Sequence, residues 1–257
     1  MPRHVALRRI GWFCSAVPLF ALPLAAQSPV QSSPAVPVSQ EPHHHLVLKN
    51  SYVRAYYVDV APHESTLRHR HDLPYFAVLL SGGGAPAAPT AGAAAPQPPQ
   101  APRAIYSPGG ISHAVSNPGD TPFRNVTVEL LRPQGKVRNR CDEIVRGQPL
   151  EQCDKPASLA ASLPLRYAVF ETSEILVEYW QLPANFAAHP WGGRLDTLLV
   201  DLENASVSNA GGSDSRRAAP GGVLWLPAGS HPVFKTRPDR GGHFLAITFK
   251  DSAPAPR

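Results

Sequence analysis

The chain has 257 residues, with 24 basic against 19 acidic ones, which gives a formal net charge of +5. Three of the arginines lie in the first 26 residues, which hold no acidic residue, so the remainder carries 5 − 3 = +2. This weak charge comes without a lysine cluster or a basic stripe interleaved with aromatic residues. It excludes nucleic acid as the expected partner, because such binding needs several phosphate contacts at once.

Residues 1–26 have the pattern of a cleavable export signal. Three arginines flank or precede an apolar run over residues 10–26, which ends in Leu24-Ala25-Ala26, whose alanines suit a cleavage site. The run is shorter than the ~20 residues that a membrane-spanning helix needs, and Pro18 and Pro23 interrupt it. We therefore expect a secreted or periplasmic protein with no stable membrane insertion after signal cleavage.

Residues 27–45 are rich in proline, serine and glutamine and end in His43-His44-His45. This composition predicts a flexible leader rather than a folded element. The sequence leaves two interpretations of the histidine run: exposed imidazoles bind metals weakly, and such a run also occurs incidentally.

From residue 46 onward the pattern is that of short β-strands, and no long segment has helical periodicity. The predicted strands are rich in β-branched and aromatic residues and cover residues 52–60, 75–80, 103–106 and 125–131. The tract over residues 82–102 consists mainly of glycine, alanine and proline, carries no charge and cannot build a packed strand. Two roles remain open for it, an inert spacer and a flap beside the site described next.

Three histidines in this strand-rich half have the spacing of a metal site. His69 and His71 are two residues apart, so on a strand both project from the same face. His113 follows the turn-forming sequence Pro108-Gly109-Gly110, and a later strand can bring it to the same point. Neutral imidazole suits zinc, iron, copper and nickel, and three protein ligands leave a position open for water or substrate.

These residues resemble the two sequence signatures of the cupin family of small β-barrels. The second signature, Pro-x-Gly-x-x-His-x-x-x-Asn, is complete, with Pro108, Gly110, His113 and Asn117 at its fixed positions, although Pro102 replaces its leading glycine. The resemblance implies an all-β fold of the double-stranded β-helix, or jelly-roll-like, kind.

The first cupin signature is only partly present. Beside the His69-Arg70-His71 pair it keeps its last glycine, Gly82. However, His63 stands at the position of its first glycine, and Tyr75 stands at the position of its glutamate. The carboxylate ligand of the family is therefore missing from its usual position.

The resemblance implies a three-histidine cupin site, in which imidazoles alone hold a divalent transition metal. Its ligands are His69, His71 and His113, and the metal is iron, manganese, zinc, nickel or copper. Tyr75 lies on the same predicted strand face and is the candidate catalytic residue. It is placed to hydrogen-bond a metal-bound water or substrate, or to act as an acid near its ordinary pKa of about 10, and simple filling of the barrel is the alternative.

Cys141 and Cys153 are the two cysteines outside the export signal, and they lie in a connector over residues 133–164. An exported protein meets an oxidising compartment, so we predict a disulfide between them, worth about 3 kcal/mol in the chain-entropy model. The alternatives are a zinc site and a pair of redox-active thiols. The first has too few ligands nearby, and the second lacks the Cys-x-x-Cys spacing of oxidoreductases.

The first half repeats in weakened form about 120 residues later. Residues 175–182 match residues 53–60, and residues 227–231 resemble the second signature with one residue deleted. The sequence therefore predicts two tandem cupin barrels, over residues 46–132 and 165–250.

The second barrel lacks the three-histidine pattern. His189 is retained, but Trp191 stands where the second histidine would be, and the deletion leaves His231 out of register. We expect a degenerate barrel with a structural role. A two-histidine site completed by Glu178 or Asp196 is the weaker alternative.

The leading hypothesis is a secreted, metal-dependent and dioxygenase-like enzyme that acts on a small organic molecule. A non-catalytic binding protein for a small ligand or a metal ion is the alternative, and a purely structural two-barrel protein is a third. The fold does not choose among them, because cupins include enzymes of several classes, storage proteins and sensors. A homo-oligomer is compatible with each.

Overall fold

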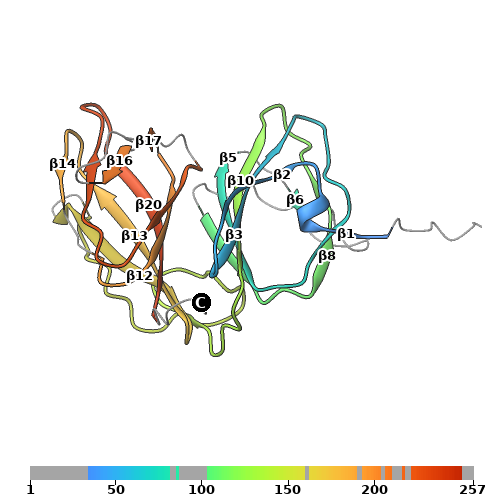
Figure 1. Cartoon of the computed structure of the whole chain (residues 1–257), viewed down its shortest axis with the longest axis horizontal. Coiled ribbons are helices and arrows are strands. Elements are labelled where there is room, and N and C mark those ends of the chain that lie inside the picture. The colour runs from blue at the N-terminus through green and yellow to red at the C-terminus, as the bar shows by residue number, and fades with distance from the viewer. Residues whose placement is uncertain are drawn as a thin grey trace, which may run out of the picture. The chain divides into compact units, whose positions relative to one another are not determined.

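The computed structural model describes residues 34–81, 85–86, 103–159, 162–189, 193–203, 206–209, 216–217 and 221–250 (Figure 1). Within these ranges the chain is built mainly from β-strands, and the 3-10 turn η1 (Val38–Gln40) lies near the start. No helix in the described part is long and apolar enough to cross a membrane. The expected export signal, residues 1–26, and most of the 82–102 tract lie outside the described residues.

The N-terminal barrel, made of strands β1 to β10, combines three sheets. The five-stranded sheet has the order β2 (His44–Lys49), β3 (Val53–Val60), β10 (Phe123–Leu130), β5 (Tyr75–Ser81) and β7 (Arg103–Ser107). The three-stranded sheet has the order β1 (Val36–Pro37), β4 (His69–His71) and β8 (Ile111–His113). A short ribbon pairs β6 (Ala85–Pro86) with β9 (Val115–Ser116).

Side-chain alternation along β3 separates two apolar cores, because successive residues of a strand point to opposite faces. On one face Val58 packs with Leu79 and Phe123 inside the N-terminal barrel. On the other face Val53 and Ala55 belong to a larger cluster that includes residues of the second half of the chain.

The C-terminal barrel, made of strands β11 to β20, has two sheets. The six-stranded sheet has the order β11 (Arg138–Asn139), β12 (Leu165–Glu171), β13 (Ile175–Leu182), β20 (Gly242–Phe249), β15 (Thr197–Asp201) and β18 (Val223–Leu226). The four-stranded sheet has the order β14 (Ala187–Ala188), β19 (Pro232–Lys235), β16 (Ser206–Asn209) and β17 (Arg216–Arg217).

The strand pairing of the second barrel repeats that of the first. Val53 lies opposite Leu130 in the β3–β10 pair, and Ile175 lies opposite Phe249 in the β13–β20 pair. The predicted match between residues 53–60 and 175–182 therefore coincides with β3 and β13.

One apolar core joins the large sheets of the two barrels. The buried Phe170 of β12 contacts Phe76 of β5 at a ring-centroid distance of 5.3 Å and Tyr106 of β7 at 4.9 Å. Tyr52, just before β3, packs on Phe249 of β20 at 4.8 Å. Aromatic pairs of this kind bury large apolar areas, so this cluster stabilises both barrels together.

The connector between the barrels is held by a disulfide and by one buried amide. Cys141 and Cys153 are bonded, which confirms the predicted disulfide. The Asn139 side chain, only 1% exposed, accepts hydrogen bonds from the backbone N–H groups of Ile144 and Val145 and donates to the carbonyls of Val145 and Gln148. It thereby fixes the loop that the disulfide closes.

The structure differs from the predicted flexible leader over residues 34–45. β1 pairs in parallel with β4, η1 follows it, and His44 begins β2. Val38 and Glu41 are 4% and 2% exposed, so this polar segment is held by contacts with the barrel that composition does not reveal.

Candidate metal centre

The predicted histidines lie on two paired strands of the small sheet. β4 and β8 are antiparallel, and their register sets His69 directly opposite His113. The side chains of His69 and His71 are 0% and 1% exposed, since both point into the barrel as the two-residue spacing predicts.

The turn before His113 is docked against the end of β4. Gly109 and Gly110 have φ angles of +83° and +70°, a region that favours glycine. A Cβ atom on Gly109 would lie 2.4 Å from the carbonyl oxygen of Leu73, and the Gly110 N–H donates to the carbonyl of His71 at 2.7 Å. The glycines of the second signature thus set the position of β8.

The three imidazoles converge. Nε2 of His113 lies 3.1 Å from Nε2 of His69, and the ring of His71 lies 5.0 Å from that of His69 and 5.2 Å from that of His113. Two nitrogens that each lie about 2.0–2.1 Å from one tetrahedral ion are about 3.3 Å apart. The separation of the His69 and His113 nitrogens therefore fits a shared ion.

The remaining ring nitrogens support the same interpretation. Nδ1 of His69 donates to the carbonyl of Leu67 at 2.8 Å, which leaves Nε2 with a lone pair. Nδ1 of His71 is buried and has no hydrogen-bond partner among the described residues. An unpaired polar atom in a barrel interior costs free energy, and a metal bound by this ring would offset that cost.

Burial keeps these imidazoles neutral. Desolvation, helped by the neighbouring rings, lowers the pKa of His71 to about 2 and that of His113 to about 4. Burial also lowers the pKa of His69. Neutral imidazole is the form that coordinates a metal, so near neutral pH the cluster needs to release no proton before it binds one.

A fourth imidazole, which sequence reasoning missed, belongs to the same cluster. The His44 ring lies 4.6 Å from that of His69, and one possible ligand atom from each of His44, His69 and His71 lies within 4.8 Å of the others. That three-residue group does not include His113. However, Nε2 of His113 lies 3.1 Å from Nε2 of His69, so His113 is also placed to share an ion with His69. The cluster therefore comprises four imidazole rings, those of His44, His69, His71 and His113.

Glu41 orients this fourth imidazole. Its Oε2 accepts a hydrogen bond from Nδ1 of His44 at 2.5 Å, and its Oε1 accepts from the N–H of Leu67 at 3.1 Å. Burial raises the pKa of Glu41, but the hydrogen bond and charge of His44 outweigh that effect, and the pKa is lowered overall. A carboxylate that holds the outer nitrogen of a histidine is a common support for a metal ligand.

Tyr75 lies beside the cluster and packs against it. Its ring stacks on that of His71 at a centroid distance of 4.2 Å and an interplanar angle of 22°. Burial raises the pKa of Tyr75, while a hydrogen bond with Ser107 opposes the shift. The phenol is therefore neutral at physiological pH, and its ring fixes the orientation of His71.

A buried carboxylate, also missed from the sequence, lies one strand away from Tyr75. Glu129 of β10 is 1% exposed and is the register partner of both Tyr75 and Arg54. Its Oε2 lies 3.1 Å from Nε of Arg54, an ion pair whose geometry is not that of a hydrogen bond. Burial raises the pKa of Glu129, and the charge of Arg54 opposes the rise.

Two other signature positions are structural. Asn117 is fully buried, and its Nδ2 donates to the carbonyls of Val60, Ala61 and Thr121. His63 has a φ of +62°, so it keeps the left-handed backbone that explains a glycine at this signature position.

The C-terminal barrel brings no comparable group together among its described residues. His189 and His231 are exposed, and Nδ1 of His189 bonds to the carbonyl of Pro232. Trp191 lies outside the described residues. The group of three potential ligands found in the described part of the chain is the one in the N-terminal barrel.

No protein-family model matches the sequence, and no curated protein matches it significantly. Solved structures do match. AerE from Microcystis aeruginosa is 12% identical with a TM-score of 0.50, over 82% of this chain and 99% of AerE. The salicylate 1,2-dioxygenase from Pseudaminobacter salicylatoxidans is 14% identical with a TM-score of 0.50, over 82% and 77%. A mutant of that dioxygenase in complex with gentisate is 13% identical with a TM-score of 0.50, over 84% and 76%.

Likeness at this level of identity shows the fold alone. The chain has an all-β, two-barrel cupin fold, which confirms the fold predicted from its signatures and its internal repeat. The substrates that the neighbours' names mention are those of the neighbours.

Proposed function

We propose that this chain is an exported, metal-dependent cupin that carries out dioxygenase-like chemistry on a small organic molecule. The observation that carries the proposal is the convergence of neutral imidazoles from two paired strands, buried for His69 and His71 and half-buried for His113, with the ring nitrogens of His69 and His113 3.1 Å apart. His69, His71 and His113 would hold the ion. His44 would be a fourth ligand, and the enzyme then needs an ion that accepts a fifth ligand from substrate or oxygen.

The donor set fits a first-row transition metal, because imidazole suits iron, copper, nickel and zinc. Such an ion, when bound, supplies Lewis acidity and, for iron or copper, redox chemistry. Glu41 holds the ring of His44 through its outer nitrogen, and Tyr75 holds the ring of His71 by stacking. Glu129 keeps a second acid–base group inside the same barrel, beside Tyr75 in the sheet.

Oxygen uptake by the purified, iron-loaded protein tests this function. We expect uptake with at least one member of a panel of catechols, hydroxybenzoates, flavonoids and thiols, and its loss in His113→Ala. The matched control is His45→Ala, since His45 is exposed and leaves the cluster intact. Absence of uptake with iron-, manganese-, nickel- and copper-loaded preparations would contradict the catalytic proposal.

The role of Tyr75 is tested by Tyr75→Phe. This change keeps the ring on His71 and removes the hydroxyl near Ser107. If Tyr75 only positions His71, turnover falls less than about threefold; if it transfers a proton, turnover falls about 10²-fold or more. Tyr75→Leu, which removes the ring, is expected to weaken metal binding in either case.

A binding or storage role for a metal ion is the second candidate, and His44 favours it. Four imidazoles complete a tetrahedral shell and leave no position for substrate, as in closed structural sites. A metal that stays bound in four-coordinate form with no turnover would support this role.

Export is tested separately, by measuring the intact mass of the secreted protein. We expect a mass that corresponds to cleavage before Gln27.

A further inference from the structure

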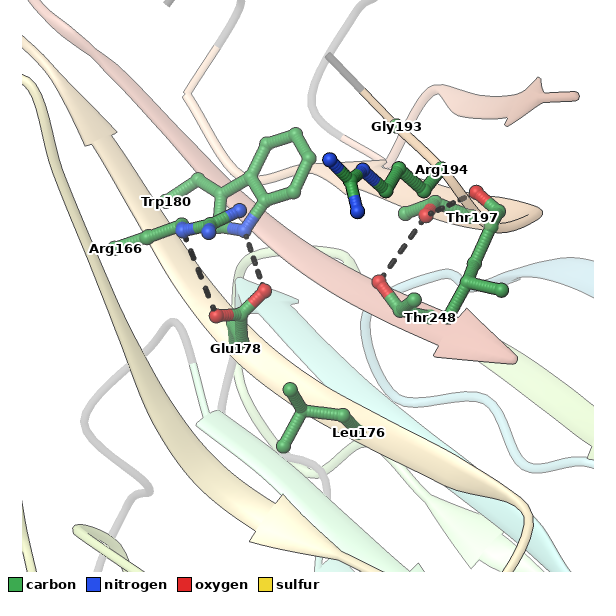
Figure 2. A pocket seen from close by; sticks show the side chains of 9 residues that line it. Arg166, Leu176, Glu178, Trp180, Gly193, Arg194, Thr197 and Thr248 are labelled. Atoms are coloured by element: carbon green, nitrogen blue, oxygen red, sulfur yellow. Dashed lines mark hydrogen bonds and ion pairs between the residues drawn. The ribbon is translucent and has the colours of Figure 1, made fainter. Parts of the chain in front are cut away.

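The C-terminal barrel contains a polar pocket that the metal cluster does not use. It has a volume of about 320 Å³, within the range of small-molecule sites. Figure 2 shows the side chains that line it on β12, β13, β15 and β20 and in the segment before β15. The lining residues on β13 and β20 share the sheet face of Phe244, which belongs to the apolar cluster of this barrel, so the pocket continues the interior of the barrel.

The register of the two barrels explains why a pocket exists here. In the N-terminal barrel, Arg54, Glu129 and Tyr75 lie side by side across β3, β10 and β5. In the C-terminal barrel, Leu176, Thr248 and Thr197 hold the same ladder positions on β13, β20 and β15. Three large side chains are thus replaced by smaller ones, which leaves space inside the barrel.

The two barrels also differ in the charged side chain at one equivalent position. His44 lies opposite Val58 in the β2–β3 pair, and Arg166 lies opposite Trp180 in the equivalent β12–β13 pair. The ligand-type imidazole of one barrel is therefore replaced by a guanidinium in the other. A guanidinium is never a metal ligand near neutral pH, but it recognises carboxylates with two parallel hydrogen bonds.

The charged side chains that line the pocket, Arg166, Glu178 and Arg194, have a net charge of +1. Nε of Arg166 lies 3.9 Å from Glu178, whose other oxygen accepts from the indole N–H of Trp180 at 3.1 Å. Arg194 has no ion-pair partner among the described residues, and Figure 2 shows it extending toward the part of the pocket that Trp180 lines. A single bound anion would balance this charge.

A threonine pair on the opposite side presents an acceptor. The Thr197 hydroxyl donates to the carbonyl of Leu195 at 3.3 Å and lies 3.1 Å from the Thr248 hydroxyl. A hydroxyl has one proton, so Thr248 must donate to Thr197 when Thr197 donates to Leu195. The oxygen of Thr248 is then left to accept a hydrogen bond from a ligand.

We propose that this pocket binds a small hydroxycarboxylate anion, with its carboxylate on Arg194 and Arg166 and its hydroxyl on Thr248. The indole of Trp180 and the side chain of Leu176 supply the apolar wall between the two ends. The second barrel is thus a ligand-binding barrel in its own right, and its site is distinct from the histidine cluster.

Isothermal titration calorimetry of the full chain with 4-hydroxybenzoate tests the proposal. We expect one site per chain, and at least tenfold weaker binding of 4-hydroxybenzamide, which has the same shape without the charge. The same titration with gluconate tests an aliphatic hydroxycarboxylate. Both acids are tested at 10 mM, which is on the order of ten times the Kd of a weak, 1 mM ligand. If neither acid releases or absorbs heat at this concentration, the proposal is overturned.

Variants locate the site. Arg194→Gln should weaken binding at least tenfold, whereas Arg237→Gln, an exposed arginine of the same barrel paired with Asp239, should leave it unchanged. Thr248→Val should weaken 4-hydroxybenzoate more than benzoate. Binding should survive in His69→Ala; its loss there would place the ligand in the N-terminal barrel and contradict the proposal.

Because Arg194 is exposed, its replacement should leave the melting temperature unchanged, and this is measured alongside. If Arg194→Gln melts normally and binds the acid as tightly as the parent protein, the assignment of the carboxylate to this pocket is wrong.

Discussion

Burial makes the imidazoles of the N-terminal barrel usable as ligands at neutral pH. His69 and His71 are almost fully enclosed, and each ring raises the cost of a positive charge on the next. The same burial leaves Nδ1 of His71 unpaired in the described structure, a cost that stability alone would not favour. The unpaired nitrogen lowers the stability of the fold, and a role in ligand binding explains why it is present.

Glu41→Gln tests the support of His44. The amide keeps the size of the side chain but loses the charge that holds the imidazole, so we expect metal affinity to fall about 10–100-fold. Competition with a chromophoric chelator measures it. Glu151→Gln, which removes a carboxylate paired with Arg138 in the connector, is the control and should leave the affinity unchanged. Equal affinities in both variants would exclude His44 as a supported ligand.

The metal-free protein should lose stability in mild acid. The pKa of His113 is lowered from 6.5 to about 4 in the folded protein, and that of His243 is lowered to about 4 as well. Below pH 6.5 the unfolded chain therefore binds more protons than the folded one. The stability from these groups is fully present above pH 6.5 and is lost as the pH falls toward 4.

Urea unfolding at pH 7.5, 6, 5 and 4.5 in the presence of a chelator measures this loss. His113→Gln removes one of the groups and should make the decline shallower. A parent protein and variant with the same pH dependence would contradict the account of His113.

At the scale of elements, the turn between β7 and β8 controls where His113 lies. We expect Gly109→Ala to be more destabilising than Gly110→Ala, because its Cβ would meet the Leu73 carbonyl at 2.4 Å while that of Gly110 meets nothing within 4 Å. The left-handed φ angle alone costs about 1–2 kcal/mol in either variant. Urea unfolding and metal retention check the difference, and equal losses would show that the close approach is unimportant.

The elements also show what the sequence could and could not predict. His69, His71 and His113 were found because strand alternation and the signature turn are local features. His44 was missed because its role depends on the pairing of β1 with β4 and of β2 with β3, which places a polar segment inside the barrel. Glu129 was missed because a lone carboxylate in an apolar strand carries no spacing signal.

At the scale of the whole molecule, one core couples two barrels with different sites. Phe170 is fully buried between Phe76 and Tyr106 of the other barrel. The sequence predicted two barrels from the repeat but could not predict this shared core, because facing sheets leave no mark at fixed sequence spacing.

Phe170→Ala should lower the free energy of unfolding by about 3–5 kcal/mol, as other buried Phe-to-Ala changes do, and should destabilise both barrels. Hydrogen exchange of peptides from β10 and β20 measures each barrel. Faster exchange confined to β20 would show that the barrels are stabilised separately.

We propose that imidazoles from β2, β4 and β8 together hold one transition metal. The most direct measurement combines element analysis of the natively purified protein with X-ray absorption spectroscopy at the edge of the metal found. We expect about one first-row ion per chain, with a shell of imidazole nitrogens at about 2.0–2.2 Å that disappears in His69→Ala. Less than a tenth of an equivalent after reloading, or a shell without imidazole, would contradict it.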